Sequence, residues 1–277
     1  MNGKICLVTG GTSGIGKATA QALAQMGATV VIVGRNASKT AQLVEELRAA
    51  SGNKNVDALL ADLSSQQEVR RLANEFKRKY SHLHVLLNNA GAYFMQRQLS
   101  VDGIEMTFAL NHLASFLLTD LLLDTIKASA PARIINVSSG AHTSGKIEFD
   151  NLQGEQVYRP RAYDNSKLAN ILFTMELAHR LEGSGVTVNA LHPGFVATGF
   201  AKNNGKVIAA LVSLFAPLVA RSPAKGAETS IYLASSPSVE GITGKYFYDS
   251  HVVPAAPQAT DMVVARKLWA VSAQMVH

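Results

Sequence analysis

The stretch Ile5-Cys6-Leu7-Val8-Thr9-Gly10-Gly11-Thr12-Ser13-Gly14-Ile15-Gly16 joins an apolar run to a glycine-rich loop. Apolar residues then recur at helical spacing as far as Gly27, so the expected order is strand, glycine loop, helix. Glycines allow backbone N–H groups to approach a phosphate at the N-terminus of a helix. The spacing is Gly-x-x-x-Gly-x-Gly. A lone glycine loop is more often a plain turn, but this context favours a dinucleotide site.

Apolar runs and helical patterns continue to alternate along the chain. Continuous apolar runs are typical of parallel strands that helices cover on both faces. No linker or internal repeat divides the 277 residues, so we expect one domain, residues 1–277. We predict an α/β fold with a single, doubly wound parallel sheet of about seven strands and helices on both faces. The expected strands are 5–8, 29–33, 56–61, 85–87, 134–137, 186–191 and 244–248.

The net charge of +6 raises the question of an acidic partner. The basic residues are scattered, and the densest group, within 70–79, is interleaved with apolar residues as on a solvated helix face. We therefore do not expect nucleic-acid binding. No group of histidines or carboxylates has the spacing of metal ligands, and we interpret His112, His142 and His192 as structural residues.

Cysteine use and hydropathy favour a cytoplasmic protein. Cys6 is the only cysteine, so no disulfide within the chain is possible, which suits a reducing compartment. The chain passes from Met1 directly into its first apolar run, and we expect no signal peptide. The apolar stretch Val207–Val219 is too short to span a bilayer and contains Pro217, so we predict no transmembrane segment.

Tyr163 and Lys167 open a segment with apolar residues at helical spacing, and four residues apart they share one face of a helix. If that face lines a cavity, the ammonium of Lys167 is expected to lower the pKa of the Tyr163 phenol. Tyr163 could then give or take a proton. Alone the pair is a weak signal, because a Tyr and a Lys on a surface helix usually have no catalytic role.

Polar residues stand where several expected strands end. Gly34-Arg35 follows the second strand, where an arginine suits the 2′-phosphate of NADP(H), and the alternative is an exposed arginine in a loop. Asn88–Gly91 and Ser138-Ser139 follow two later strands, as at a ligand-binding edge. The connection 140–161 is long enough to suggest a functional loop.

Together these features resemble the short-chain dehydrogenase/reductase family over nearly the whole chain. The resemblance implies a Rossmann fold. Segments 111–119, 166–170, 192–194 and 244–247 are similar to the retinol dehydrogenase-like branch and to related NADP(H)-dependent carbonyl reductases. The ordered set that carries the family resemblance is Thr9–Gly16, Asp62, Asn88–Gly91, Asn111, Ser139, Tyr163-x-x-x-Lys167 and Pro193-Gly194.

The resemblance implies a catalytic set of Asn111, Ser139, Tyr163 and Lys167. Ser139 would hold the substrate oxygen beside Tyr163, the general acid or base. Lys167 would favour ionisation of Tyr163 and bind the nicotinamide ribose, and Asn111 would hold a relay water. The alternatives are that Ser139 is a turn cap, that Asn111 is a buried structural amide and that Lys167 is a solvated helix residue. The implied cofactor-binding residues are Gly10, Thr12, Ser13, Gly14, Ile15, Gly16, Arg35, Asp62, Leu63, Asn89, Ala90, Gly91, Tyr163, Lys167, Pro193, Gly194, Val196 and Thr198.

The resemblance further implies an enzyme with NADP(H) favoured over NAD(H), which interconverts an alcohol and an aldehyde or ketone of a fairly apolar, small-molecule substrate. The alternative is an NADP(H)-binding redox sensor or scaffold without turnover. Residues 200–221 are expected to form a substrate lid, with a membrane-surface contact by 206–221 or a core-packed helix as alternatives. A homo-oligomer, dimer or tetramer, is expected through the apolar faces of the Asn111 and Tyr163 helices, unless the monomer covers them.

Overall fold

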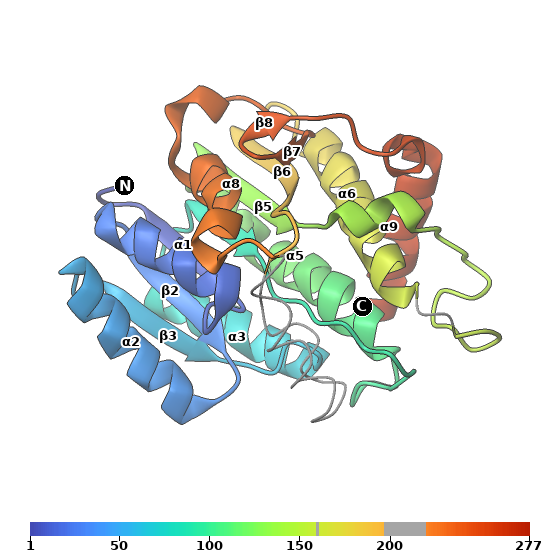
Figure 1. Ribbon diagram of the computed structural model, residues 1–277, viewed down its shortest axis with the longest axis horizontal. Coiled ribbons are helices and arrows are strands. Elements are labelled where there is room, and N and C mark those ends of the chain that lie inside the picture. The colour runs from blue at the N-terminus through green and yellow to red at the C-terminus, as the bar shows by residue number, and fades with distance from the viewer. Residues whose placement is uncertain (159–160, 197–219) are drawn as a thin grey trace.

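The computed structural model describes residues 1–158, 161–196 and 220–277 (Figure 1). Their strands form one eight-stranded sheet in the order β3-β2-β1-β4-β5-β6-β7-β8. The first seven are parallel, which confirms the predicted sheet, and β8 adds a short antiparallel edge. Two residues are too few for a hydropathy pattern to reveal β8. The strands are β1 (Ile5–Thr9), β2 (Thr29–Gly34), β3 (Val56–Leu60), β4 (Val85–Asn88), β5 (Ala132–Val137), β6 (Val186–His192), β7 (Tyr246–Tyr248) and β8 (His251–Val252).

Helices cover both faces of the sheet, as the continuous apolar strands predict (Figure 1). One face packs Cys6 and Val8 against α1, α2 and α8, and the other packs Leu7 against α3, α5, α6 and α9. Successive β1 side chains therefore enter different cores. The helices are α1 (Gly14–Gln25), α2 (Ala37–Ser51), α3 (Gln66–Lys79), α4 (Met106–Phe108), α5 (Ala114–Lys127), α6 (Ala162–Arg180), α8 (Pro223–Ser235) and α9 (Met262–Val276).

The chain reverses direction across the sheet at β1. From β1 it builds outward through β2 to β3, and it then returns to place β4 on the other side of β1. The loops after β1 and β4 therefore separate, one towards each half of the sheet. A crevice at the carboxyl ends of the strands is the expected consequence of this order, and it is where open α/β sheets bind ligands.

The expected single helix around Asn111 is three pieces. α4 leads into a π-helical turn at Ala109–Leu113, and α5 follows it. Among the described residues, the combined stretch Met106–Lys127 is the one helix long and apolar enough to cross a membrane. A core helix passes the same test, and 72% of this apolar window is buried inside the protein.

The C-terminal helix α9 covers the apolar faces of α5 and α6. Trp269 packs edge-on against Phe116, with 4.9 Å between ring centroids, and stacks near Phe173 at 5.9 Å. The chain itself therefore covers these faces of α5 and α6, which was the alternative to self-association. The homo-oligomer stays a prediction. The expected lid, residues 200–221, and Thr198 fall almost wholly outside the described residues, and only 220–221 are described.

Candidate active site

A cleft of about 1200 Å³ runs along the carboxyl ends of the parallel strands. It exceeds the ~300–1,000 Å³ of pockets for drug-sized ligands, so it has room for a dinucleotide beside a substrate. Of the residues predicted from the sequence, Gly16 and Asn111 do not line it, and Thr198 lies outside the described chain. Those that line it are Gly10, Thr12, Ser13, Gly14, Ile15, Arg35, Asp62, Leu63, Asn89, Ala90, Gly91, Ser139, Tyr163, Lys167, Pro193, Gly194 and Val196.

The loop between β1 and α1 has a backbone that only glycine adopts easily. Gly10 and Gly14 have φ angles of 62° and 53°, in the left-handed region. A Cβ at Gly16 would lie 2.4 Å from the Gly10 carbonyl oxygen, so this residue packs the helix against the loop rather than facing the cleft. Ser13, the N-cap residue of α1, makes no side-chain cap. The first N–H groups of α1 therefore remain available to an anion at the helix N-terminus.

Thr9 and Asn89 tie this loop to the end of β4. The Thr9 hydroxyl accepts hydrogen bonds from the backbone N–H groups of Asn89 and Ala90, at 2.9 and 3.1 Å. The Asn89 amide donates to the Thr9 carbonyl at 2.8 Å. These hydrogen bonds therefore join the first residues of the two strand-end loops. The sequence does not reveal this role of Thr9, because it depends on a strand end 80 residues away.

At the end of β2 the cleft is lined by Arg35, Asn36 and Lys39. Asn36 caps α2, since its side chain accepts a hydrogen bond from the Lys39 N–H at 2.9 Å. The cap turns the chain so that two cations and a helix N-terminus meet at one end of the cleft. A Cβ at Gly34 would lie 2.3 Å from the Thr40 hydroxyl oxygen, so a larger side chain has no room there.

Ser139, Tyr163 and Lys167 meet at the other end of the cleft. The Ser139 side chain hydrogen-bonds the Tyr163 phenol and also accepts from the Ala141 N–H at 3.2 Å, so it is a turn cap as well. The Lys167 ammonium lies 5.5 Å from the centre of the Tyr163 ring and donates to the Val137 carbonyl at 3.1 Å. Ser138, by contrast, donates to the Lys167 carbonyl, within the wall.

The expected lowering of the Tyr163 pKa is not what the structure shows. Burial raises the pKa of Tyr163 to about 12, partly offset by the hydrogen bond to Ser139. Burial also lowers the pKa of Lys167 to about 8, so its ammonium is a desolvated charge. The loss of water around the phenol has a larger effect on the pKa of Tyr163 than the nearby charge of Lys167. At neutral pH Tyr163 is a protonated phenol.

Asn111 lies on the π-helical turn, fully buried behind the cleft. Its amide accepts from the Ala92 N–H and donates to the Ala92 carbonyl, both at 2.9 Å, and donates to the Ser166 hydroxyl at 3.0 Å. Both amide protons therefore serve protein partners. Asn111 therefore fixes the loop after β4 against α6, as expected for a buried structural amide. The relay water stays a prediction.

His142 supports Ser139 from behind. Its Nε2 accepts a hydrogen bond from the Ala256 N–H at 3.1 Å, so the ring proton is on Nδ1, which donates to the Ser139 carbonyl at 2.8 Å. Burial lowers the pKa of His142, which keeps this neutral tautomer. His142 is therefore a structural residue, as predicted, and it fixes the backbone of Ser139 in the cleft.

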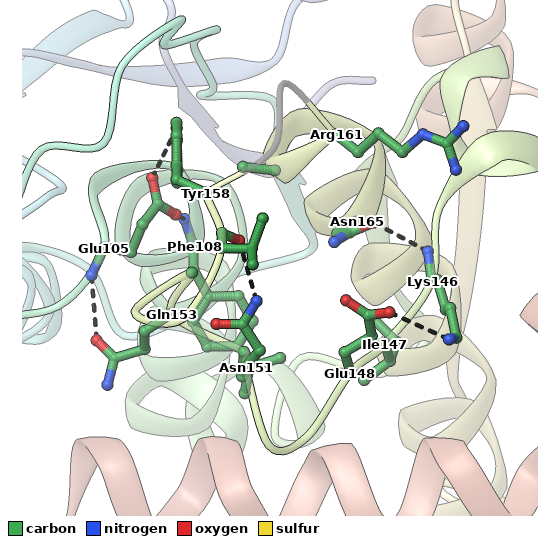
Figure 2. Close-up of a pocket in the computed structure, with 14 residues that line it drawn as sticks. Glu105, Phe108, Lys146, Ile147, Glu148, Asn151, Gln153, Tyr158, Arg161 and Asn165 are labelled. Atoms are coloured by element: carbon green, nitrogen blue, oxygen red, sulfur yellow. Dashed lines mark hydrogen bonds and ion pairs between the residues drawn. The ribbon is translucent and has the colours of Figure 1, made fainter.

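A second, smaller pocket is lined by residues of the 146–165 stretch together with Glu105 and Phe108 (Figure 2). It has a volume of about 70 Å³, far below the ~300 Å³ at which ligand pockets begin. In it the Tyr158 hydroxyl meets the Glu105 carboxylate at 3.3 Å and the Phe94 carbonyl at 3.2 Å, while Gln153 accepts from the Glu105 N–H. These bonds connect the 145–158 connection to the loop that presents Phe94 to the cleft.

Several cleft residues were not singled out from the sequence. Asn36 and Lys39 could have been found as polar residues just after Arg35, within the first turn of a helix. Phe94, Met106 and Leu110 are apolar residues of the cleft lining, but nothing in their local pattern separates them from core residues. Their role follows only from the path of the chain after β4.

Comparison with known proteins assigns the family. The family model described as short chain dehydrogenase matches residues 4–208. Human retinol dehydrogenase 11 is 44% identical over 275 residues, which span 99% of this chain and 86% of that protein. A crystal structure of an uncharacterized protein from Mycobacterium paratuberculosis is 31% identical, with a TM-score of 0.79, covering 99% of this chain and 94% of the other.

A further solved structure, the Pseudomonas aeruginosa RhlG/NADP active-site complex, is also 31% identical, with a TM-score of 0.71 over 89% of this chain and 94% of that one. The similarity extends through sequence and fold alike, well beyond the glycine loop. The chain therefore belongs to the short-chain dehydrogenase/reductase family of oxidoreductases, in its retinol dehydrogenase-like branch.

Proposed function

We propose that this enzyme uses NADP(H) to interconvert an alcohol and an aldehyde or ketone of a fairly apolar substrate. One observation carries the proposal: the cleft has two cations, Arg35 and Lys39, at one end and the Ser139, Tyr163 and Lys167 group at the other. The first end suits a phosphate and the second a proton transfer. When bound, the nicotinamide cofactor supplies or accepts the hydride.

Tyr163 is the proposed general acid in reduction and general base in oxidation. With a pKa of about 12, its phenol is protonated at neutral pH and can donate to a substrate oxygen that gains negative charge. The Ser139 hydroxyl, bonded to the phenol, is placed to hold the same oxygen. The nearby Lys167 ammonium favours the phenolate that remains after proton donation.

The chemistry of the β2 end supports NADP(H) over NAD(H). A dinucleotide without the 2′-phosphate is usually held by a carboxylate near this strand end, whereas a 2′-phosphate is held by an arginine. Residues 34–36 are Gly, Arg and Asn, and Gly34 has no space for an acidic side chain. The solved RhlG complex, which contains NADP, adds support from a relative.

Arg35→Ala tests this cofactor assignment. We expect its Kd for NADPH to rise at least ~10-fold, because a charge-assisted contact to phosphate is worth about 1.5–3 kcal/mol, while its Kd for NADH changes little. Titration of cofactor fluorescence measures both constants. Arg48→Ala is the control, because Arg48 lies in the following helix α2 and does not line the cleft. Equal losses for NADPH and NADH would refute the 2′-phosphate assignment.

The substrate is proposed to be apolar because Phe94, Met106 and Leu110 line the same cleft as Tyr163. The similarity to retinol dehydrogenase 11 makes long apolar alcohols and aldehydes, retinoids among them, the first candidates. A lid formed by residues 200–221 and a cytoplasmic location remain proposals from the sequence.

Turnover of NADPH over a panel of aldehydes and ketones of graded size and polarity, retinal among them, tests the reaction. We expect oxidation of NADPH with the apolar members, and a ~10²–10⁴-fold lower kcat for Tyr163→Phe with the Kd for NADPH retained. Tyr80→Phe is a matched control, because Tyr80 bonds Asp57 at the far end of α3. NADPH binding without turnover, unaffected by Tyr163→Phe, would instead favour a sensor or scaffold.

A further inference from the structure

Arg221 lies beside the segment Pro193–Val196, although no recognised motif contains it. The segment follows β6 directly and lines the cleft. Arg221 pairs with Val196 in an isolated parallel bridge, and its N–H donates to the Phe195 carbonyl at 2.8 Å. The backbone of Arg221 is therefore tied to the cleft-lining segment by a bridge that lies outside the strands of the sheet.

The side chain of Arg221 lies flat against Gly194. Gly194 has a φ angle of 82°, and a Cβ built there would be 2.8 Å from Cδ and 2.9 Å from Nε of Arg221. The close approach requires glycine on one side and a flat, extended side chain on the other. A guanidinium with its alkyl stem has that shape.

The guanidinium ends on the tight turn between β7 and β8. It donates to the Tyr248 hydroxyl at 2.6 Å and forms a two-point ion pair with Asp249. Asp249 and Ser250 have φ angles of 47° and 64°, as in a two-residue type I′ hairpin turn, where Asp is tolerated. This turn directs the Asp249 carboxylate back towards Arg221.

His192 completes the arrangement from the other side of the segment. Its ring stacks on Tyr248, with centroids 4.3 Å apart and planes 10° apart, and its Nδ1 accepts from the Gly194 N–H at 3.0 Å. Gly194 is therefore held through its N–H by His192 and through its open face by Arg221. Both partners lie against the same Tyr248 ring, since the Arg221 guanidinium is 5.1 Å from its centre.

The segment also packs against α8, beside the start of α1. A Cβ at Gly226, in α8, would lie 2.6 Å from Val196 and 3.4 Å from Ile15, so both side chains approach the same glycine. A shift of the segment would therefore change the width of the cleft where the cofactor is proposed to bind.

We infer that Arg221 is a positioning residue that holds Pro193–Val196 in its cofactor-binding geometry, with Asp249 and Tyr248 as its anchors. The inference rests on the proposed function, because the ligand is NADP(H). The ion pair is partly exposed, with 28% of the Arg221 and 45% of the Asp249 side chain accessible, and such pairs add little to stability. The effect of losing it should therefore appear in cofactor binding rather than in unfolding.

Arg221→Met keeps the alkyl stem and removes the guanidinium. We expect the Kd for NADPH, from fluorescence titration, and the KM for NADPH to rise ~10-fold, with kcat within about two-fold of wild type and the thermal midpoint nearly unchanged. Asp249→Asn should weaken binding less, and in the Arg221→Met background it should add nothing, because the two residues act as one unit. A merely structural role would lower the thermal midpoint and kcat without this KM effect.

Lys225→Met is the matched control, because Lys225 forms an exposed ion pair with Glu228 on the neighbouring helix α8, outside the cleft. Its Kd for NADPH should equal that of wild type. If Arg221→Met also binds NADPH like wild type, or if Lys225→Met weakens binding equally, the inference is wrong while the proposed function stands. Failure of wild type itself to bind NADPH would overturn both.

Discussion

Lys167 places a positive charge at a site where only 4% of the residue remains accessible to water. The Val137 carbonyl accepts one of its protons, and the Tyr163 ring lies 5.5 Å away. Burial of a charge with so few partners is costly, and it lowers the pKa of Lys167 from 10.5 to about 8. A fold retains such a group when the site needs it, which is consistent with its proposed function beside Tyr163.

The cost at Lys167 predicts a stabilising variant. A shift of that size corresponds to about 3 kcal/mol, and the lost hydrogen bond offsets about 1 kcal/mol of it. Lys167→Met should therefore unfold with a free energy about 2 kcal/mol higher than wild type at pH 7. Between pH 8 and 10.5 the unfolded chain retains a proton that the folded chain has released, so wild-type stability rises and the advantage of the variant is lost.

Urea unfolding of both proteins at pH 7, 9 and 10.5 measures this difference. Groups common to both chains titrate alike and cancel. The exposed variant Lys225→Met is the control, for which we expect a difference near zero at each pH. A gain for Lys167→Met that stays constant across the pH range would contradict the assignment of the cost to the buried charge.

At the scale of elements, the phosphate loop depends on how closely α1 approaches it. Gly16 is a packing residue: its Cα faces the Gly10 carbonyl and the Asn89 amide, with no room for a methyl group. The sequence correctly marks the glycine as necessary but assigns it to the cofactor surface. Gly16 contacts the phosphate loop on the side away from the cleft. This contact sets the position of the N–H groups at the start of α1.

Gly16→Ala should distort the loop. The added Cβ would lie 2.4 Å from the Gly10 oxygen and 2.6 Å from the Asn89 nitrogen. We expect a loss of ~1–3 kcal/mol in unfolding free energy, as for overpacked cores, and at least a ~10-fold higher Kd for NADPH. Thermal unfolding and fluorescence titration measure the two effects.

Gly52→Ala provides a variant of comparable stability loss. Gly52 has a φ angle of 68° at the end of α2, with open space around its Cβ position, so alanine there costs ~1 kcal/mol from backbone strain alone. Its Kd for NADPH should not change. If both glycine variants weaken NADPH binding to the same extent, general destabilisation rather than loop geometry is the cause.

At the scale of the whole molecule, α9 decides which surfaces the protein presents. The faces of α5 and α6 that the sequence suggested for self-association are packed against Trp269, which also carries the Arg180 guanidinium 4.2 Å above its ring. The predicted homo-oligomer is therefore expected to use another surface, because this one is filled within the chain.

Trp269→Ala tests the docking of α9. We expect a loss of about 2–4 kcal/mol in unfolding free energy, near the lower end for Trp→Ala because the ring is only partly buried. The mass from light scattering should not change. Val263→Ala, on the exposed side of α9, is the control and should stay within ~0.5 kcal/mol of wild type. A wild-type oligomer that Trp269→Ala dissociates would show that α9 is a subunit interface.

Much of the site could be predicted because its parts are local. Tyr163 and Lys167 share a face by helical spacing, and Ser139 and the glycine loop stand at strand ends that a parallel sheet brings to one edge. The direction of the Tyr163 pKa shift could not be predicted in this way. It depends on how much water the complete cleft excludes, and the residues that line the cleft extend from Gly10 to Val196.

The periodicity of the chain was sufficient for the parallel sheet and its helical layers, which follow from hydrogen bonding and burial among neighbouring residues. The order of strand, glycine loop and helix indicated the phosphate loop, and the family resemblance implied the Ser139, Tyr163 and Lys167 group. The tertiary structure alone decided that Gly16 and Asn111 lie in the wall, that His142 and Arg221 hold cleft segments, and that α9 covers α5 and α6. Each of these depends on contacts between residues far apart in sequence, where the distance and the exclusion of water are properties of the assembled fold.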